Sequence, residues 1–354
     1  MSQMSVSRFV LSAVCVLLFA VIGKIIVLDG DLVTDTGTGQ QTRPLFSSLK
    51  NEYEFDNQPY AVMIDNHSFG RPYHSGLGAA DVYYEALAEG GITRIMAIFD
   101  GPQGLSKTGP VRSARPYFVE WASEYGAVYL HVGGSDAALS DLVSKTAGVF
   151  NIEGMIYEGF DDYFKRDRSI NRPHNDFANL VNMERDLLKT SDGDTWISGV
   201  DEPGFQFGKI KKSNKLLPEN ATEVKINFGV FPQYNVKYIY DSESSTYARY
   251  IGGVPHVDKA SGESLTTSNV IVQFTDYWVI DDVGRLEFRT TGTGNAMLFR
   301  DGKAYKGTWS KEKNIAGSNS PARTIFVTKD GSEFKLSSGK TWVEVLNLEK
   351  NVVF

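Results

Sequence analysis

The sequence predicts an α+β protein, in which a mixed α/β first domain is followed by a β-rich second domain that forms a small barrel or sandwich. Helix-like and strand-like segments alternate irregularly up to about residue 199, whereas short alternating runs with regular turns fill the chain from residue 224 onward. The 354 residues are also enough for about two domains. An apolar run near the start adds an N-terminal transmembrane helix to this prediction.

The apolar run covers residues 9–28 and reads FVLSAVCVLLFAVIGKIIVL. A helix needs about 20 apolar residues to cross a bilayer, and Lys24 is the only charge in this run. Arg8 precedes the run, and Asp29 and Asp31 follow it. Since basic residues favour the cytoplasmic side, we predict a signal anchor with a cytoplasmic N-terminus and an extracytoplasmic main body.

Other interpretations of residues 1–28 stay open. A cleaved signal peptide would end near Gly23, where small residues precede the cut. A lipid anchor on Cys15 is less favoured, because Cys15 lies inside the apolar run and follows the bulky Val14. In each case the body is exported, and residues 29–58, rich in Asp, Thr, Gly, Gln and Ser, predict a flexible tether.

The overall composition excludes several classes of function. The 36 basic and 43 acidic side chains give a net charge of −7, so we expect no nucleic-acid partner. The single cysteine lies in the apolar run, which excludes an intramolecular disulfide and a multi-thiolate metal site. The sequence holds no HExxH, phosphate-binding loop, dinucleotide fingerprint or Gly-x-Ser-x-Gly elbow. We therefore expect neither a metal nor a cofactor.

The first domain is predicted over residues 59–199. Residues 60–65 form an apolar run that ends in Asp65, as in a buried strand that leads to a site. Glu89-Gly90-Gly91 separates two strand-like segments and predicts a β-hairpin, with a helix over 79–88 as the alternative. The further strands are expected at 82–88, 92–99 and 127–132.

Three helices are expected in the same domain. One follows Pro116 and ends at Gly126, with Ser113 as its N-cap, because Pro suits the first helical turn and Gly the end. The other two are predicted over 136–145 and 176–189.

Residues 200–223 are polar and Lys-rich and predict a linker, after which the β-rich domain spans 224–354. Asp301-Gly302 and Asp330-Gly331 are typical hairpin turns. Several aromatic side chains of this domain are able to stack on sugars, although a role in the core is the stronger expectation. They are Phe274, Tyr277, Trp278, Trp309 and Trp342.

Candidate site residues concentrate in the first domain, in turn-like or Gly/Pro-flanked contexts. The candidates are Asp65, Arg71, Glu85, Glu89, Arg94, Arg112, Ser113, Arg115 and His174. If they converge, they form either a closed network of Arg–carboxylate pairs, which we favour, or an open polar cleft. In an open cleft, the carboxyl groups of Asp65, Glu85 and Glu89 would supply the acid and base of a glycan-acting hydrolase or lyase.

Individual residues add weaker signals. Arg112-Ser113-Ala114-Arg115 at a predicted helix start suggests an anion site. His131 lies in an apolar strand and is expected in the core, whereas His174 lies beside polar residues in Arg172-Pro173-His174-Asn175. His67 and His74 have a spacing that many unrelated loops share, so they indicate no metal site.

Long strings of the sequence resemble a known family. YAVMIDNHSFGRPYHSGLGAADVYYEALAEGGITRIMAIFD and GPVRSARPYF resemble the N-terminal domain of the YerB-like proteins (DUF3048), a family of unknown function. HVDKASGESLTTSNVIVQF, GTGNAMLFRDGKAYKGTW and GKTWVEVL are similar to its C-terminal domain. The resemblance extends from about residue 58 to residue 346. It implies an α+β first domain and an exported, membrane-tethered protein, often a lipoprotein, and it brings no catalytic residues.

Together these observations predict a membrane-anchored, exported envelope protein. We expect its first domain to bind a cell-wall component or an envelope protein, and we favour a binding protein over an enzyme. A glycan-acting hydrolase or lyase and a structural scaffold are the alternatives.

Overall fold

The computed structural model describes residues 57–143, 148–155, 162–190, 205–210, 217–229, 231–312 and 322–354. The predicted anchor, and the predicted tether up to residue 56, lie outside these ranges. Within them, no helix has the length and apolar character needed to span a membrane. The described residues all belong to one compact unit, Lys50–Phe354.

A large mixed sheet organises the unit, and its first strands come from the region before residue 200. They are β1 (Pro59–Ile64), β2 (Val82–Leu87), β3 (Thr93–Asp100), β4 (Val128–His131) and β5 (Phe150–Glu153). β1 and β2 each pair antiparallel with β3, while β4 lies parallel to β1 and to β5. The Gly90 and Gly91 turn between β2 and β3 has positive φ angles of 65° and 71°. The predicted hairpin and the predicted strands are therefore confirmed.

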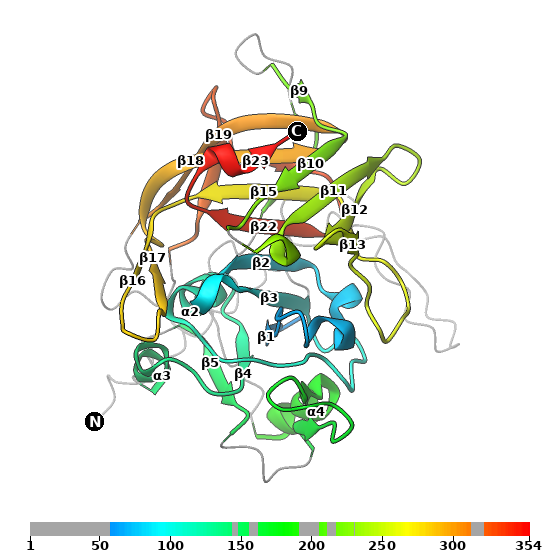
Figure 1. Cartoon of the computed structure of the whole chain (residues 1–354), viewed down its shortest axis with the longest axis vertical. Helices are drawn as coiled ribbons and strands as arrows, with labels where there is room; N and C mark the ends of the chain where they lie inside the picture. Colours follow the sequence, from blue (N-terminus) through cyan, green and yellow to red (C-terminus); the bar gives the residue numbers. More distant parts are fainter. Residues whose placement is uncertain are drawn as a thin grey trace, which may run out of the picture. The chain divides into compact units, whose positions relative to one another are not determined.

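The same sheet continues with strands from the region after residue 217. They are β9 (Glu219–Asn220), β15 (Asn269–Phe274), β18 (Gly292–Arg300), β19 (Lys303–Lys311), β20 (Ile325–Thr328) and β22 (Thr341–Leu346). β22 lies between β15 and β2 and is parallel to both, so it joins early and late parts of the chain (Figure 1). Residues of β2, β15 and β22 are buried along their whole length, which suits strands covered on both faces.

A second sheet is built only from late residues. Its strands are β10 (Glu223–Ile226), β11 (Val236–Asp241), β12 (Thr246–Ile251), β13 (Val254–Pro255), β14 (Thr266–Thr267) and β23 (Val352–Val353). Buried and partly exposed residues alternate along β12, as expected for a strand with one face on the core. Neither this sheet nor the large one closes into a barrel among the described residues, which corrects the barrel expectation.

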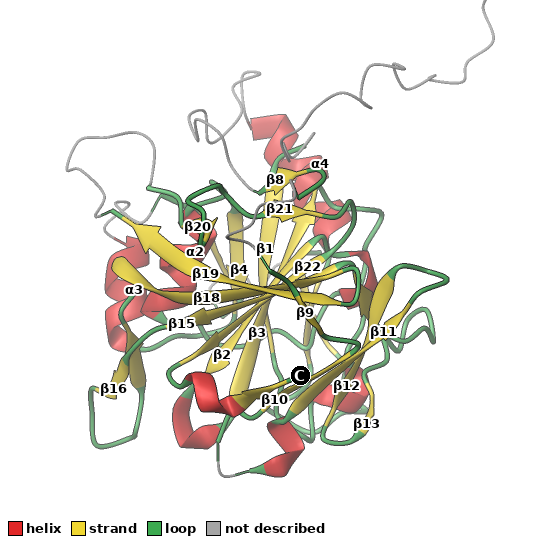
Figure 2. Ribbon diagram, turned by 90° about the horizontal axis from the view of Figure 1, so that it is seen from above, coloured by secondary structure: helices red, strands yellow, loops and turns green. Residues whose placement is uncertain are grey.

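Three small two-stranded sheets complete the strands. They combine β6 (Phe164–Arg166) with β7 (Asp176–Ala178), β8 (Gln206–Phe207) with β21 (Lys335–Leu336), and β16 (Tyr277–Val279) with β17 (Leu286–Phe288). β8 and β9 lie in the predicted linker, so its described parts add edge strands to late elements. Strands dominate the described residues, as the yellow elements of Figure 2 show.

Helices are few and short in the described part. They are α2 (Pro116–Ser123), α3 (Asp136–Val143) and α4 (Leu180–Thr190), with 3-10 turns at Arg71–Tyr73, Leu77–Ala79, Glu89–Gly91, Pro232–Tyr234 and Glu349–Asn351. Arg115, not Ser113, is the N-cap of α2, and Pro116 is its first residue. The helix predicted from residue 176 begins only at Leu180, because residues 176–178 pair with β6 instead.

Most of the aromatic side chains that were expected in the core of the second domain are buried. Trp309 and Trp342 are fully buried and Phe274 is 6% exposed, whereas half of Trp278 is exposed. Trp342 stacks on Tyr83 of β2 at 4.2 Å between ring centroids. His131 is also buried and bonds to Gly133 and Asn151.

Candidate functional site

The carboxylate of Asp65 is held at the end of β1. The amide N–H of Asp65 donates to the carbonyl of Pro110 (2.8 Å), which fixes the backbone at this point. One carboxylate oxygen, Oδ1, accepts from the amide of His67 (3.0 Å). The other, Oδ2, lies 2.5 Å from Nδ1 of His174 and 3.7 Å from Nε of Arg112. Asp65 therefore organises two side chains and one backbone amide, although its own side chain is only 4% exposed.

These side chains form the outer part of a site that we call the imidazole patch: His67, Phe69, Arg112 and His174, above Asp65. The rings of His67 and His174 are stacked at 5.0 Å between centroids. Phe69 lies 5.1 Å from the His67 ring and is 70% exposed. The patch thus combines an accessible aromatic ring with two imidazoles and a guanidinium.

Hydrogen bonding orients His174. Because the carboxylate of Asp65 can only accept when ionised, Nδ1 of His174 carries the proton between them. This leaves Nε2 as the ring nitrogen able to meet a ligand. For His67, burial lowers the pKa below its usual value, while Asp65 acts in the opposite direction. At neutral pH we therefore expect His67 to be uncharged.

Arg112 is the patch's cation. Its side chain is 25% exposed, and its contact with Asp65 is long for an ion pair. Its Nε is buried and has no hydrogen-bond partner within the described residues. This Nε faces the Asp65 carboxylate, and the guanidinium as a whole stays partly exposed, so Arg112 is suited to bind an anionic group through its remaining donors.

Glu89, Arg94 and Arg115 form a separate cluster of ion pairs. Glu89 lies 3.2 Å from Arg94 and 2.6 Å from Arg115. Burial acts to raise the pKa of Glu89, but the two guanidinium groups outweigh it and lower the pKa to about 2. The remaining donors of Arg94 and Arg115 reach the carbonyls of Ser113 and Ala114. The Arg115 charge of the predicted anion site at the helix start is thus already paired with Glu89.

Glu85 lies in a second, fully buried network. Its carboxylate pairs with Arg249 of β12 and accepts a hydrogen bond from Asn66 (2.9 Å). The guanidinium of Arg249 also lies 3.9 Å from Glu344 and 3.9 Å from the centre of the Trp342 ring. The side chains of Glu85, Arg249 and Glu344 are all 0% exposed. The carboxyl groups of Glu85 and Glu344 thus share the single buried guanidinium of Arg249.

The two acids differ in their contacts. Glu85 makes the direct ion pair, so we expect it to hold the negative charge, although burial raises its pKa. Burial and the neighbouring Glu85 raise the pKa of Glu344 to about 8. Glu344 is therefore protonated at neutral pH, and it accepts a hydrogen bond from Tyr238.

A chain of hydrogen bonds leads from this network to Asp65. Arg249 can only donate, so Nδ1 of His256 accepts from it and the His256 proton is on Nε2. That Nε2 donates to Nδ1 of His74 (2.8 Å), and Nε2 of His74 donates to the carbonyl of Asp65 (2.7 Å). Both rings are neutral, since burial lowers the pKa of each. Late residues of the chain thereby help to fix Asp65.

The other two candidates have supporting positions. Arg71 donates to the side-chain and main-chain oxygens of Asn66 (3.3 and 3.2 Å) and lies over the Tyr234 ring. Ser113 contributes its carbonyl to Arg94.

The structure therefore brings three of the predicted site residues, Asp65, Arg112 and His174, together beside the exposed ring of Phe69. Sequence reasoning missed the roles of His67 and Phe69 in the patch, and it missed the buried partners Arg249, Glu344 and His256. Arg249 and Glu344 did leave a signal, because each is a charged residue at a buried position of a strand. Among the described residues, no group of three or more His, Cys, Asp or Glu side chains is placed to hold a metal ion.

Comparison with known proteins places these features in a family. Residues 46–193 match the DUF3048 N-terminal domain and residues 224–343 match the DUF3048 C-terminal domain, both described as protein of unknown function. The chain is 30% identical over 343 residues to "Putative lipoprotein YerB" of Bacillus subtilis strain 168, covering 94% of each chain. It also resembles the crystal structure of Bacillus subtilis YerB, with a TM-score of 0.67 and 27% identity, over 84% of this chain and 93% of that one. The chain therefore belongs to the YerB-like DUF3048 family.

Proposed function

We propose that this chain is a membrane-anchored envelope protein whose main body lies outside the cytoplasm and binds a cell-wall glycan component through the imidazole patch. The apolar run at residues 9–28 and the flanking charges support a signal anchor with a cytoplasmic N-terminus. The lipoprotein name of the Bacillus subtilis relative supports membrane attachment of an exported body.

The observation that carries the proposal is the exposure of Phe69 beside Arg112 and the stacked imidazoles. A large aromatic ring that is 70% exposed offers an apolar surface to one face of a sugar ring. Arg112 offers the charge of a partly exposed guanidinium to a carboxylate or phosphate. A sugar unit that bears an acidic group fits both features.

Catalysis by paired carboxylates has less support. Such a mechanism needs two carboxyl groups that reach the same glycosidic bond. Glu85 is fully buried in a pair with Arg249, and Glu89 is held by Arg94 and Arg115. These two acids instead support the fold around the patch, which is the part of the scaffold hypothesis that we retain.

Retention of the full-length chain on purified cell-wall glycan, in non-ionic detergent, tests the proposal. We expect wild type to be retained and the double variant Phe69→Ala/Arg112→Ala to be lost. The matched control is Trp278→Ala/Arg285→Ala, which removes an aromatic ring that is 50% exposed and a guanidinium that is 29% exposed in the second half.

The control should bind like wild type. Equal retention of both double variants would overturn the role of the patch. No retention of wild type on glycan, together with patch-dependent capture of an envelope protein, would replace the glycan by a protein partner.

A further inference from the structure

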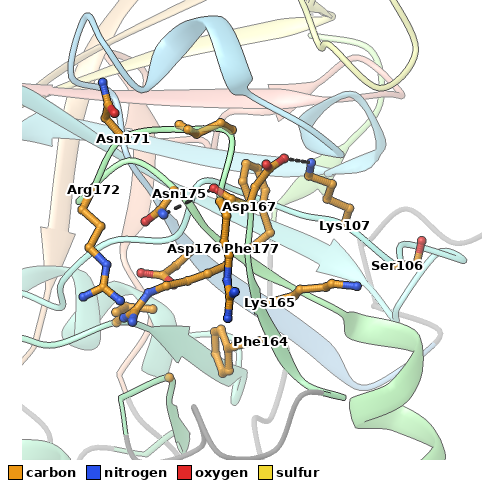
Figure 3. Close-up of a pocket in the computed structure, with 15 residues that line it drawn as sticks. Ser106, Lys107, Phe164, Lys165, Asp167, Asn171, Arg172, Asn175, Asp176 and Phe177 are labelled. Atoms are coloured by element: carbon orange, nitrogen blue, oxygen red, sulfur yellow. Dashed lines mark hydrogen bonds and ion pairs between the residues drawn. The ribbon is translucent and has the colours of Figure 1, made fainter.

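A basic cleft lies beside the imidazole patch and belongs to neither the Glu89 cluster nor the buried Glu85 network. It has a volume of about 1180 Å³ and is formed largely by β6, β7 and the loop 167–175 between them (Figure 3). Phe164 and Phe177, both buried, supply apolar surface in its lining. The cleft is large enough for several units of a polymer, since sites for drug-sized ligands occupy about 300–1,000 Å³.

The charges of the cleft are unbalanced. Five basic residues line it, and two of them are neutralised: Lys107 by Asp167 at 2.9 Å and Arg166 by Asp176 at 2.9 Å. The other three are exposed and make no ion pair within the described part of the chain. They are Lys165, Arg168 and Arg172. A concave surface with three uncompensated positive charges concentrates anions.

The cleft has a fixed backbone. Lys165 and Phe177 are cross-strand partners, and the carbonyl of Asp176 accepts from the amide of Val111 (2.7 Å), which ties β7 to the body. In the loop, Asp167 Oδ1 accepts from the amide of Ser169 (3.1 Å). The backbone amide of Asp167 donates to the carbonyl of Asn175 (2.8 Å). The positions that carry Arg168 and Arg172 are therefore held before any ligand binds, which reduces the entropy lost on binding.

Asn175 in the lining has a polar atom that lacks a partner. Asn175 is 4% exposed, and its Nδ2 donates to the carbonyl of Asp167 (3.3 Å). Its Oδ1 has no hydrogen-bond partner among the described residues. Because a buried acceptor without a donor is costly, this atom marks a place where a ligand hydroxyl would be favoured. Figure 3 shows Asn175 among the charged side chains of the cleft.

We propose that the cleft binds a hydroxyl-bearing polyanion, such as an acidic glycan or a polyol phosphate, and so extends the patch along the same polymer. Lys165, Arg168 and Arg172 contact its repeated anionic groups, and Asn175 Oδ1 accepts from a hydroxyl between them. His174 of the patch lies in the chain between Arg172 and Asn175, so one loop serves both sites. This inference rests on the proposed function for the nature of the polymer.

Binding of defined polymers to the full-length chain in non-ionic detergent tests the inference. The probes are polygalacturonate, poly(glycerol phosphate), inorganic polyphosphate and mixed micelles of phosphatidylglycerol with the same detergent. We expect at least one of the first two to bind, and Arg168→Ala/Arg172→Ala to weaken that binding by about tenfold or more, since charge-assisted hydrogen bonds are lost. Lys209→Ala/Lys329→Ala removes two exposed charges outside the cleft and should leave the affinity unchanged.

Each other outcome contradicts a named part of the inference. Equal weakening by both double variants would overturn the cleft as the site, and equal affinity for inorganic polyphosphate would overturn the hydroxyl contact. Binding to the phosphatidylglycerol micelles alone would replace the polymer by the head groups of an anionic lipid. Because Phe69→Ala/Arg112→Ala tests the patch separately on wall glycan, failure of the cleft is distinguishable from failure of the proposed function.

Discussion

His74 and His256 are 182 residues apart in the sequence, yet Nδ1 of His74 lies 2.8 Å from Nε2 of His256. The two buried rings connect Arg249 in one sheet to the backbone of Asp65, which directly follows β1 of the other sheet. Since Arg249 can only donate and a carbonyl can only accept, the proton positions along this chain are fixed. This series of hydrogen bonds requires the rings of both His74 and His256 to be neutral.

Acid should therefore weaken the fold through His74. Burial lowers the pKa of His74 from 6.5 to about 4, so the unfolded chain binds more protons than the folded one between these values. Stability is then fully present above pH 6.5 and is lost as the pH falls toward 4, by roughly 3 kcal/mol from this residue. His74→Gln keeps a donor and an acceptor but does not titrate.

Denaturant titrations of wild type and His74→Gln at several pH values check this. The wild type should lose more stability than the variant between pH 6.5 and pH 4. Parallel pH profiles would show that His74 titrates normally in the fold.

Glu85 and Glu344 should respond differently to the loss of a carboxylate. At pH 6, Glu85→Gln leaves Arg249 buried without its ion pair and should lower the free energy of unfolding by about 3–5 kcal/mol. Glu344→Gln replaces a protonated acid by a neutral group of the same shape, so we expect a loss of less than about 1 kcal/mol. Urea unfolding of both variants makes the comparison, and equal losses would contradict the assignment of the charge to Glu85.

A pH dependence of opposite sign follows for Glu344. Its pKa is raised to about 8 in the fold from 4.5, so the folded chain binds more protons between these values. Its contribution to stability should therefore fall as the pH rises from about 4.5 to about 8. The difference in melting temperature between wild type and Glu344→Gln, followed across this range, measures it. A constant difference would be inconsistent with a buried, protonated Glu344.

Glu89 should make the fold sensitive to strong acid. Because its pKa is lowered from 4.5 to about 2 by Arg94 and Arg115 despite burial, its contribution is present above pH 4.5 and is lost toward pH 2. We expect Glu89→Gln to melt at a lower temperature than wild type at pH 7, and the gap to narrow below pH 4.5. Calorimetric scans at pH 7, 4 and 3 test this, and a gap that stays the same at all three would refute the ion-pair cluster.

Gly307 should not tolerate a side chain. A Cβ added there would lie 1.9 Å from the carbonyl oxygen of Val327 on the paired strand β20. Gly307→Ala must therefore separate β19 from β20, with an expected loss of about 3 kcal/mol or more. Gly104 has a φ of 71° but open space around it, so Gly104→Ala should cost only about 1–2 kcal/mol. Denaturant unfolding of the two variants compares them, and equal losses would contradict the close approach of these strands.

Much of the local structure could be predicted from the sequence. The apolar run at residues 60–65, the Gly90 and Gly91 turn, and Pro116 at a helix start carry short-range signals that need no knowledge of distant residues. The start of the helix predicted at residue 176 was wrong, because pairing of Asp176–Ala178 with Phe164–Arg166 overrides local helix preference. Pairing between segments that are distant in the chain cannot be predicted from the local sequence.

The same limit applies to the site. Glu89 pairs with two of the candidate arginines, as expected, whereas Glu85 pairs with Arg249, which was not a candidate. Nothing near Glu85 in the sequence identifies that partner. The openness of the patch also depends on distant packing, since Asp65 and His174 meet across 109 residues. The sequence of the short polar loop around Phe69 does not predict that this side chain is exposed.

The most direct measurement of the central claim is a binding isotherm of full-length chain with solubilised cell-wall glycan fragments, in non-ionic detergent. Phe69→Ala is compared with Trp278→Ala, since both remove an exposed aromatic ring. We expect Phe69→Ala to weaken binding by about tenfold while its melting temperature stays that of wild type, and Trp278→Ala to bind normally. Unchanged affinity of Phe69→Ala would contradict the imidazole patch as the glycan-binding site.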